Sequence, residues 1–315
     1  MPDSPATTVA LDPEWAVAFE ALPAFFVNAE SLSVMRTTPL AAAPELSDRV
    51  ERTDFVVAGE GAQPDILVRL HRPVGATGAL PCVYSIHGGG YVLGSYAMDD
   101  ARFDKWCVAF NCAGVSVEYR LAPETPYPGP LEDCYRGLKW AYESHEKLGI
   151  DPTRIGIAGV SAGGGLCAAL ALLARDRGEV PVAFQLLECP MVDDRQTTPS
   201  SQLEGLAIWS RESNTFGWRS YLGSLYGTDD IPGYAVPARA SDLSGLPPAY
   251  VCVGAADGFR DEDITYAMRL NQAGVATELH VYPGAPHGVS LFAHTAVARQ
   301  YISDVEFWVS RQLAK

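Results

Sequence analysis

The sequence Gly159-Val160-Ser161-Ala162-Gly163 places a serine at the centre of a Gly-x-Ser-x-Gly pattern. Residues 154–158, just before it, form an apolar run typical of a short buried strand, and residues 164–175, just after it, indicate a buried alanine-rich helix. A sharp turn between a strand and a helix holds its serine in a sparsely populated backbone conformation, and flanking glycines keep side chains away from it. The stretch therefore predicts a nucleophilic Ser161 at the carboxyl end of a sheet, with an ordinary structural turn as the competing interpretation.

The length and charge of the chain narrow the class of protein. Its 315 residues suit one large α/β domain, or such a domain with a lid. The formal net charge of −15 argues against nucleic acid and anionic membrane surfaces as partners, and solubility is the simpler explanation of that charge. We expect no membrane span, because no apolar run reaches the length that a bilayer requires.

The cysteines indicate a reducing compartment. There are seven of them, an odd number, and their spacing matches no zinc or redox motif. Most lie in apolar runs, so we expect them to act as small buried hydrophobic residues and expect no bound metal. The first residues show no basic region followed by an apolar run, so we expect no signal peptide and a cytoplasmic protein.

The order of apolar runs predicts the fold. Residues 50–57 and 65–71 alternate between apolar and polar side chains, which favours an antiparallel pair at a sheet edge. Continuous apolar runs predict buried strands at residues 81–86, 115–119, 154–158, 182–187, 249–253 and 278–282. Helices are expected at residues 101–110, 131–148, 164–175 and 296–313. This alternation predicts an α/β fold with a mostly parallel eight-stranded sheet and helices on both faces.

One connection is too long for an ordinary loop. About 60 residues separate the strands that end near Leu187 and begin near Tyr250, and they are rich in tryptophan and tyrosine. We expect this insertion to pack with the N-terminal helical segment as a cap. The predicted division is residues 1–45 for the N-terminal part of the cap, 46–190 for the first part of the core, 191–245 for the cap insertion and 246–315 for the second part of the core.

A glycine-rich loop follows the strand at residues 81–86. Its sequence, His87-Gly88-Gly89-Gly90-Tyr91, lets backbone amides approach a substrate oxygen without interference from side chains. Neither a Walker lysine nor a Gly-x-Gly-x-x-Gly pattern follows, so a phosphate-binding loop is the weaker interpretation. We predict that the amides of Gly88, Gly89 and Ala162 form an oxyanion hole, and that His87 orients the loop.

Asp257 and His287 are the candidate partners of Ser161. Asp257 comes directly after a predicted strand, although an Asp-Gly turn is a competing interpretation, and Asp261 and Asp263 remain alternative acids. His287 follows a predicted strand in a loop rich in proline and glycine, where catalytic residues concentrate. The competing histidines lie within strands or helices, at His71, His145, His280 and His294. The chain order serine, aspartate, histidine is the one expected of an α/β-hydrolase.

These motifs resemble those of the hormone-sensitive-lipase-like esterases, the bacterial family IV of α/β-hydrolases. The resemblance extends over almost the whole chain through His87-Gly88-Gly89-Gly90, residues 119–124, residues 257–269 and Pro286-His287-Gly288. Residues 181–185, and the Pro-Gly-Pro-Leu after Tyr127, look most like the bacterial heroin esterase branch, which hydrolyses acetyl esters of bulky alcohols. The resemblance implies a helical cap, a serine carboxylesterase, a small-molecule ester substrate, no cofactor and a homodimer.

Three residues depart from the family pattern. Val160 stands where a polar residue usually precedes the nucleophile, Gly258 where proline usually follows the acid, and Val289 where phenylalanine usually follows His-Gly. None of the three replaces a reacting group, so the departures bear on rate and substrate range more than on the class of reaction.

The family implies hydrolysis of short acyl esters, from acetyl to about butyryl or hexanoyl, and the aromatic cap would restrict longer chains. We expect Tyr91, Trp209 and Val160 to line the substrate pocket. The alternatives are a non-catalytic small-ligand-binding protein on the same scaffold, like the plant gibberellin receptors, and a hydrolase of amides, lactones or carbamates.

Overall fold

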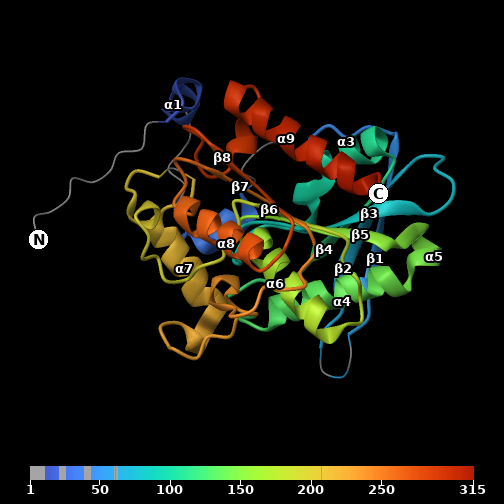
Figure 1. Cartoon of the computed structure of the whole chain (residues 1–315), viewed down its shortest axis with the longest axis horizontal. Helices are drawn as coiled ribbons and strands as arrows, with labels where there is room; N and C mark the ends of the chain where they lie inside the picture. Colours follow the sequence, from blue (N-terminus) through green and yellow to red (C-terminus); the bar gives the residue numbers. More distant parts are fainter. Residues whose placement is uncertain (1–10, 21–25, 39–43, 60, 62, 207) are drawn as a thin grey trace, which may run out of the picture.

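The computed structural model describes residues 11–20, 26–38, 44–59, 61, 63–206 and 208–315, and an eight-stranded sheet runs through this described part (Figure 1). The strands are β1 Val50–Val57, β2 Ile66–Pro73, β3 Leu80–Ile86, β4 Ala113–Glu118, β5 Ile150–Val160, β6 Gln185–Glu188, β7 Ala249–Gly254 and β8 Thr277–Tyr282. Their order is β1-β2-β4-β3-β5-β6-β7-β8. β2 is antiparallel to both β1 and β4, and the other neighbouring strands are parallel. The predicted sheet is therefore confirmed.

Helices cover both faces of the sheet. They are α1 Pro13–Glu20, α2 Leu32–Thr37, α3 Asp100–Phe110, α4 Gly129–Glu143, α5 His145–Leu148, α6 Ala162–Arg177, α7 Arg211–Leu222, α8 Arg260–Gln272 and α9 Ala296–Leu313. Buried side chains of α3 and α9 form one apolar cluster with the sheet, and those of α4, α6 and α8 belong to a second cluster (Figure 1). Two cores on opposite faces explain why the central strands are apolar on both sides.

The helices differ from the sequence predictions in two places. The helix after Ser161 begins at Ala162, earlier than the predicted start at residue 164, and almost all of it is buried. The single helix predicted over residues 131–148 is divided into α4 and α5 at Ser144. The amphipathic pattern continues through the break, so the sequence pattern alone does not reveal it.

The long connection between β6 and β7 folds into α7 and three short 3-10 helices at Ser200–Gln202, Gly223–Leu225 and Pro237–Arg239. Three of its aromatic side chains are buried, with Trp209 6%, Trp218 0% and Tyr221 1% exposed, whereas Phe216, Tyr226 and Tyr234 are partly buried. The N-terminal part reaches this insertion where the Val27 amide donates to the Ser213 hydroxyl at 3.0 Å.

The N-terminal part also contacts the core. Arg36 on α2 donates to the backbone carbonyls of Val92 and Ala122 and forms a two-pronged ion pair with Glu124. Residues 1–10, 21–25 and 39–43 of the predicted N-terminal cap segment lie outside the described residues. The division of the chain into core and cap stays a prediction.

We predict that Trp218→Ala lowers the free energy of unfolding by about 3–5 kcal/mol, because it removes a fully buried indole from the larger core. Urea denaturation measures the change. The matched control is Phe307→Ala on α9, whose side chain is 63% exposed and whose loss should cost less than about 0.5 kcal/mol. Equal stability of the two variants would show that the insertion adds little to the folded state.

Candidate active site

Ser161 occupies the tight turn between β5 and α6. Its backbone has φ 58° and ψ −121°, a conformation that residues other than glycine rarely adopt. Three backbone hydrogen bonds hold it there: the Ser161 amide donates to the Glu188 carbonyl at 2.8 Å, and the Ser161 carbonyl accepts from the amides of Gly165 and Met191, each at 2.9 Å. The strained backbone of Ser161 is therefore held in place by the neighbouring strand as well as by the helix.

The glycines of the motif are required by close packing. A Cβ on Gly159 would lie 2.1 Å from the Gly163 carbonyl oxygen, and a Cβ on Gly163 would lie 2.0 Å from the Ile86 carbonyl oxygen. Both distances are far shorter than any real contact of a Cβ atom. The two glycines thus allow α6 to start against β5 and β3, which sets the position of the serine between them.

Ser161, His287 and Asp257 form a continuous hydrogen-bonded series. The Ser161 Oγ lies 3.0 Å from Nε2 of His287, and Nδ1 of His287 lies 2.7 Å from Oδ2 of Asp257. The other carboxylate oxygen of Asp257 accepts the Phe259 amide at 3.0 Å, which fixes the carboxylate. This geometry suits a serine whose proton can pass to an imidazole that is oriented by a carboxylate.

The competing residues are engaged elsewhere. His71 lies in the core against the Ser116 hydroxyl, His145 faces the Tyr142 carbonyl, and His280 pairs with Glu278. The remaining competing histidine, His294, has its ring against Phe292.

The alternative acids are also separate from the histidine. Asp261 accepts from Arg260 and from the Ser200 amide, and neither oxygen of Asp263 has a hydrogen-bond partner among the described residues. Within the described part of the chain, Asp257 and His287 are therefore the acid and the imidazole that are linked to Ser161 by hydrogen bonds.

The glycine-rich loop lies beside the serine. A Cβ on Gly88 would be 3.5 Å from the Cβ of Ser161, and Gly89 has φ 118°, a conformation suited to glycine. Ala162 is the first residue of α6, where amides have no partner within the helix. The three predicted oxyanion donors are thus brought to the same end of the sheet as Ser161.

His87 supports this loop. Its Nδ1 donates to the Gly88 carbonyl at 2.9 Å, its ring stacks on Tyr119, and the Tyr119 hydroxyl donates to the His87 carbonyl. Burial lowers the pKa of His87 to about 4, so the ring is neutral near pH 7. These contacts are those of a residue that orients the loop.

The three residues expected to line the substrate pocket, Trp209, Val160 and Tyr91, differ in their exposure and in their contacts. Trp209 packs directly on the glycine-rich loop, because a Cβ on Gly90 would lie 2.0 Å from its ring. Val160 directly precedes Ser161 and is partly exposed. Tyr91 is 1% exposed, donates its hydroxyl to the Met191 carbonyl and stacks on Tyr221, so the structure gives its side chain packing contacts and no access to a substrate.

The environment of His287 favours its charged form. Burial of the ring opposes the imidazolium, but the Asp257 carboxylate and the Cys189 sulfur outweigh this and hold the pKa of His287 well above its ordinary value. Cys189 is buried, as expected of the cysteines, but it also lies beside the imidazole, which we did not predict. The available signal was its position two residues after the strand predicted at residues 182–187, at the carboxyl end of the sheet that also carries Ser161, Asp257 and His287.

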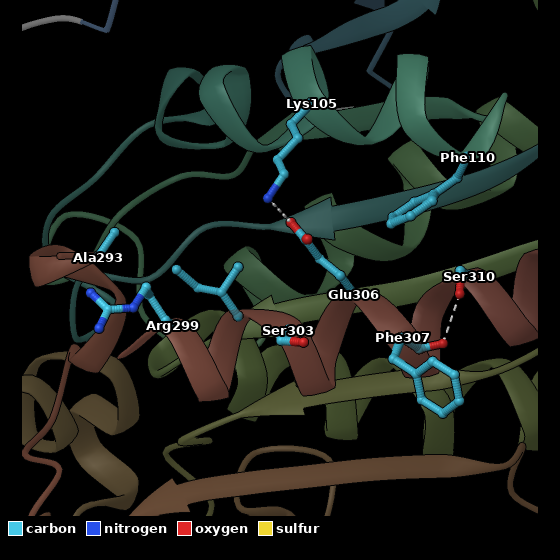
Figure 2. Close-up of a pocket in the computed structure, with 9 residues that line it drawn as sticks. Lys105, Phe110, Ala293, Arg299, Ser303, Glu306, Phe307 and Ser310 are labelled. Atoms are coloured by element: carbon cyan, nitrogen blue, oxygen red, sulfur yellow. Dashed lines mark hydrogen bonds and ion pairs between the residues drawn. The ribbon is translucent and has the colours of Figure 1, made fainter. Parts of the chain in front are cut away.

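An open pocket lies on another part of the surface, between α3 and α9 (Figure 2). Its volume is about 570 Å³, and an ion pair between Lys105 and Glu306 crosses it. The side chains of Phe110 and Phe307 form its apolar end. Neither Ser161 nor His287 lines it, so this pocket is separate from the hydrogen-bonded series.

None of the described helices combines the length and the hydrophobicity that a segment needs to cross a bilayer.

Comparisons of sequence and of structure with known proteins agree with one another on the family of this chain. Residues 83–291 match a family described by the alpha/beta hydrolase fold. Carboxylesterase NlhH of Mycobacterium tuberculosis is 36% identical over 288 residues, covering 90% of each chain. An ethyl acetate hydrolase of Pseudomonas putida is 32% identical and covers 78% of this chain and 82% of its own length. The solved structure titled Bacterial Heroin Esterase superposes with a TM-score of 0.92 at 41% identity, covering 96% of this chain and 98% of the other.

We predict that the His287 ring in the free protein titrates above the ordinary histidine value of about 6.5, because Asp257 stabilises its cation. The ion pair then stabilises the fold fully below that ordinary value, and this contribution is lost as the pH rises through the raised pKa of the folded state. NMR of the imidazole protons follows the titration.

Asp257→Asn should lower the pKa of His287, because it removes the carboxylate charge. The matched control is Asp261→Asn, whose carboxylate is bound by Arg260 and Ser200 instead and whose loss should leave the titration unchanged. A pKa of His287 that stays the same in Asp257→Asn contradicts the assignment of Asp257 as its partner.

Proposed function

The chain belongs to the alpha/beta hydrolase family and hydrolyses carboxylic esters, and we propose that it acts on short acyl groups through an acyl-enzyme formed on Ser161. The observation that carries the proposed mechanism is the series of hydrogen bonds from Ser161 Oγ through His287 to Asp257. A hydroxyl at a strained turn, with an imidazole 3.0 Å away, is arranged for nucleophilic attack.

In the proposed reaction, Ser161 attacks the ester carbonyl while His287 Nε2 accepts its proton. His287 then passes this proton to the oxygen of the leaving alcohol, and Asp257 holds the ring in the tautomer that leaves Nε2 free to accept. Water, deprotonated by the same nitrogen, cleaves the acyl-enzyme and regenerates the serine. The residues that carry these steps need no metal or organic cofactor.

The negative charge of the tetrahedral intermediate would be stabilised by the amides of Gly88, Gly89 and Ala162. Their backbone nitrogens donate no hydrogen bond to another described residue. One such donor is typically worth about 3 kcal/mol of activation free energy, so the set makes a large contribution to the rate.

The preference for short acyl groups is supported by the contact of Trp209 with the glycine-rich loop. The ring packs on Gly90, and its Nε1 donates to the Asn214 side chain at 3.2 Å, which fixes the ring against α7. A fixed indole beside the oxyanion donors leaves little room for a long chain. The relative from Pseudomonas putida is named for an acetyl ester, which is consistent with this preference.

The departures from the family pattern leave this chemistry in place. The Gly258 carbonyl accepts a hydrogen bond from the Ser200 hydroxyl, which ties the acid loop to the insertion despite the lack of proline. Val289 is buried, and Val160 contributes an apolar side chain beside the serine. We propose that these three residues tune the rate and the range of substrates.

The remaining expectations stay predictions. The complete set of Ser161, His287 and Asp257 argues against a non-catalytic ligand-binding protein, whereas an amide, lactone or carbamate would use the same groups.

The homodimer is supported by the edge strand β8, which exposes part of Leu279 and Val281. The cytoplasmic location is supported by seven buried cysteines that form no disulfide.

We predict that Ser161→Ala lowers kcat for p-nitrophenyl acetate by at least about 10⁴-fold, because no other group replaces the nucleophile. Spectrophotometric release of p-nitrophenol measures it. The matched control is Ser303→Ala on α9, in the separate pocket of Figure 2, which should retain the rate of the unchanged protein.

The same assay compares chain lengths. We expect acetate and butyrate esters to be cleaved much faster than the palmitate ester, since Trp209 limits the acyl pocket. Unchanged activity of Ser161→Ala would contradict the acyl-enzyme on Ser161, and faster cleavage of the palmitate ester would contradict the preference for short acyl groups alone.

A further inference from the structure

We propose that Cys189, Asp257 and His287 form a binding site for one zinc-class divalent ion, and that this ion reversibly inhibits the enzyme. The inhibition rests on the proposed role of His287 as the catalytic base, whereas the binding of the ion does not. The cysteine sulfur, a carboxylate oxygen and an imidazole nitrogen lie within 4.8 Å of one another.

The three side chains are held by a rigid framework. Cys189 directly follows β6, while Asp257 and His287 follow β7 and β8, and these three strands are parallel neighbours in the sheet. The Cys189 amide donates to the Cys252 carbonyl at 2.6 Å, and the Ala256 amide donates to the Ala285 carbonyl at 2.9 Å. These bonds tie all three loops together, so the potential ligands are positioned before any ion binds.

The chemistry of the three groups selects the class of ion. Thiolate, imidazole and carboxylate are the groups that bind zinc in proteins, with metal–ligand distances of about 2.0–2.3 Å. Three protein ligands and one water complete a tetrahedral site. Magnesium and calcium prefer more oxygen ligands than this site offers, so they should bind poorly.

Access to the site follows from the geometry of the triad. The His287 side chain is 11% exposed and Ser161 is 6% exposed. The ring of His287 is therefore the part of the site that solvent reaches most readily. The distance of 2.7 Å between His287 Nδ1 and Asp257 Oδ2 must widen slightly to place an ion between them, which a small rotation of the ring provides.

Two buried acidic side chains lie close enough to Asp257 to interact with it electrostatically. Glu262 and Asp263 are 3% and 0% exposed, and none of their four carboxylate oxygens has a hydrogen-bond partner among the described residues. Burial, with Asp257 among the neighbouring acids, raises the pKa of both groups well above the ordinary value. A divalent ion close to Asp257 would lower these pKa values, because its charge stabilises the ionised carboxylates.

Binding of the ion would stop the reaction because it engages the imidazole. The ion replaces the proton on Nδ1 of His287. A charged ring releases that proton to solvent and keeps the one on Nε2, whereas a neutral ring moves its proton from Nδ1 to Nε2 through solvent. In both cases Nε2 carries a proton and cannot accept that of Ser161. The Cys189 thiol releases one proton to solvent and its sulfur becomes a thiolate ligand, with no change of oxidation state. A chelator reverses each step.

The test is a titration of the full-length protein with cadmium ion, which binds thiolate strongly and reports on it through the ultraviolet charge-transfer band of the cadmium–sulfur bond. We expect one ion per chain, the appearance of this band, and a loss of esterase activity of about tenfold or more that EDTA restores. Magnesium ion at the same concentration should leave the activity unchanged.

The variants Cys189→Ala and Cys189→Ser should lose the band, and the cadmium concentration that halves each variant's own activity should rise by about tenfold or more. The control Cys82→Ala removes another fully buried cysteine, on β3, and should behave as the unchanged chain. Inhibition of equal sensitivity in both Cys189 variants, or the absence of the band in the unchanged chain, would overturn the proposal.

The binding measurement is independent of the proposed mechanism. Ser161→Ala should still show the cadmium–thiolate band, since Ser161 supplies none of the three ligands. A band in an enzyme whose activity the ion does not affect would overturn the inhibitory role of the site. A failure of Ser161→Ala to lose activity would instead count against the acyl-enzyme, while the band would still report on Cys189.

Discussion

The backbone strain at Ser161 is the constraint on which the rest of the site depends. The residue keeps a positive φ because its amide and carbonyl are bound by Glu188, Gly165 and Met191, so a neighbouring strand and a helix both hold the turn. Such a conformation costs on the order of 1–3 kcal/mol and persists only where the surrounding structure determines it. The close approaches at Gly159 and Gly163 supply that determination, and a side chain at either position would displace the turn.

The parallel sheet explains how distant residues meet. Ser161 and His287 are 126 residues apart in the chain, yet both follow strands whose carboxyl ends lie at one edge of the sheet. Glu188 also stabilises this edge, since its buried carboxylate accepts from Arg102 on α3 and from Tyr301 on α9. Two helices on one face thus hold the end of β6, and β6 in turn holds Ser161. The geometry of Ser161, His287 and Asp257 therefore depends on the packing of the whole core.

Much of this arrangement could be predicted from the sequence, because the informative residues are subject to local constraints. A glycine-flanked serine between a predicted strand and a predicted buried helix indicates the turn that carries Ser161. Asp257 and His287 follow predicted strands, which places them at the same carboxyl end of the sheet. Other features depend on contacts between distant segments. Tyr91 looks like a pocket residue in the glycine-rich loop, but its ring lies among residues of the insertion. Cys189 looks like a core residue, and only the neighbouring loops show that it faces the imidazole.

The most direct test of the account is a crystal structure of the protein after reaction with a phosphonate ester. We expect phosphorus bonded to Ser161 Oγ, with one phosphonyl oxygen about 3 Å from the amides of Gly88, Gly89 and Ala162 and with His287 beside the leaving-group position. Phosphorus on any other residue, or a phosphonyl oxygen turned away from these amides, would contradict it.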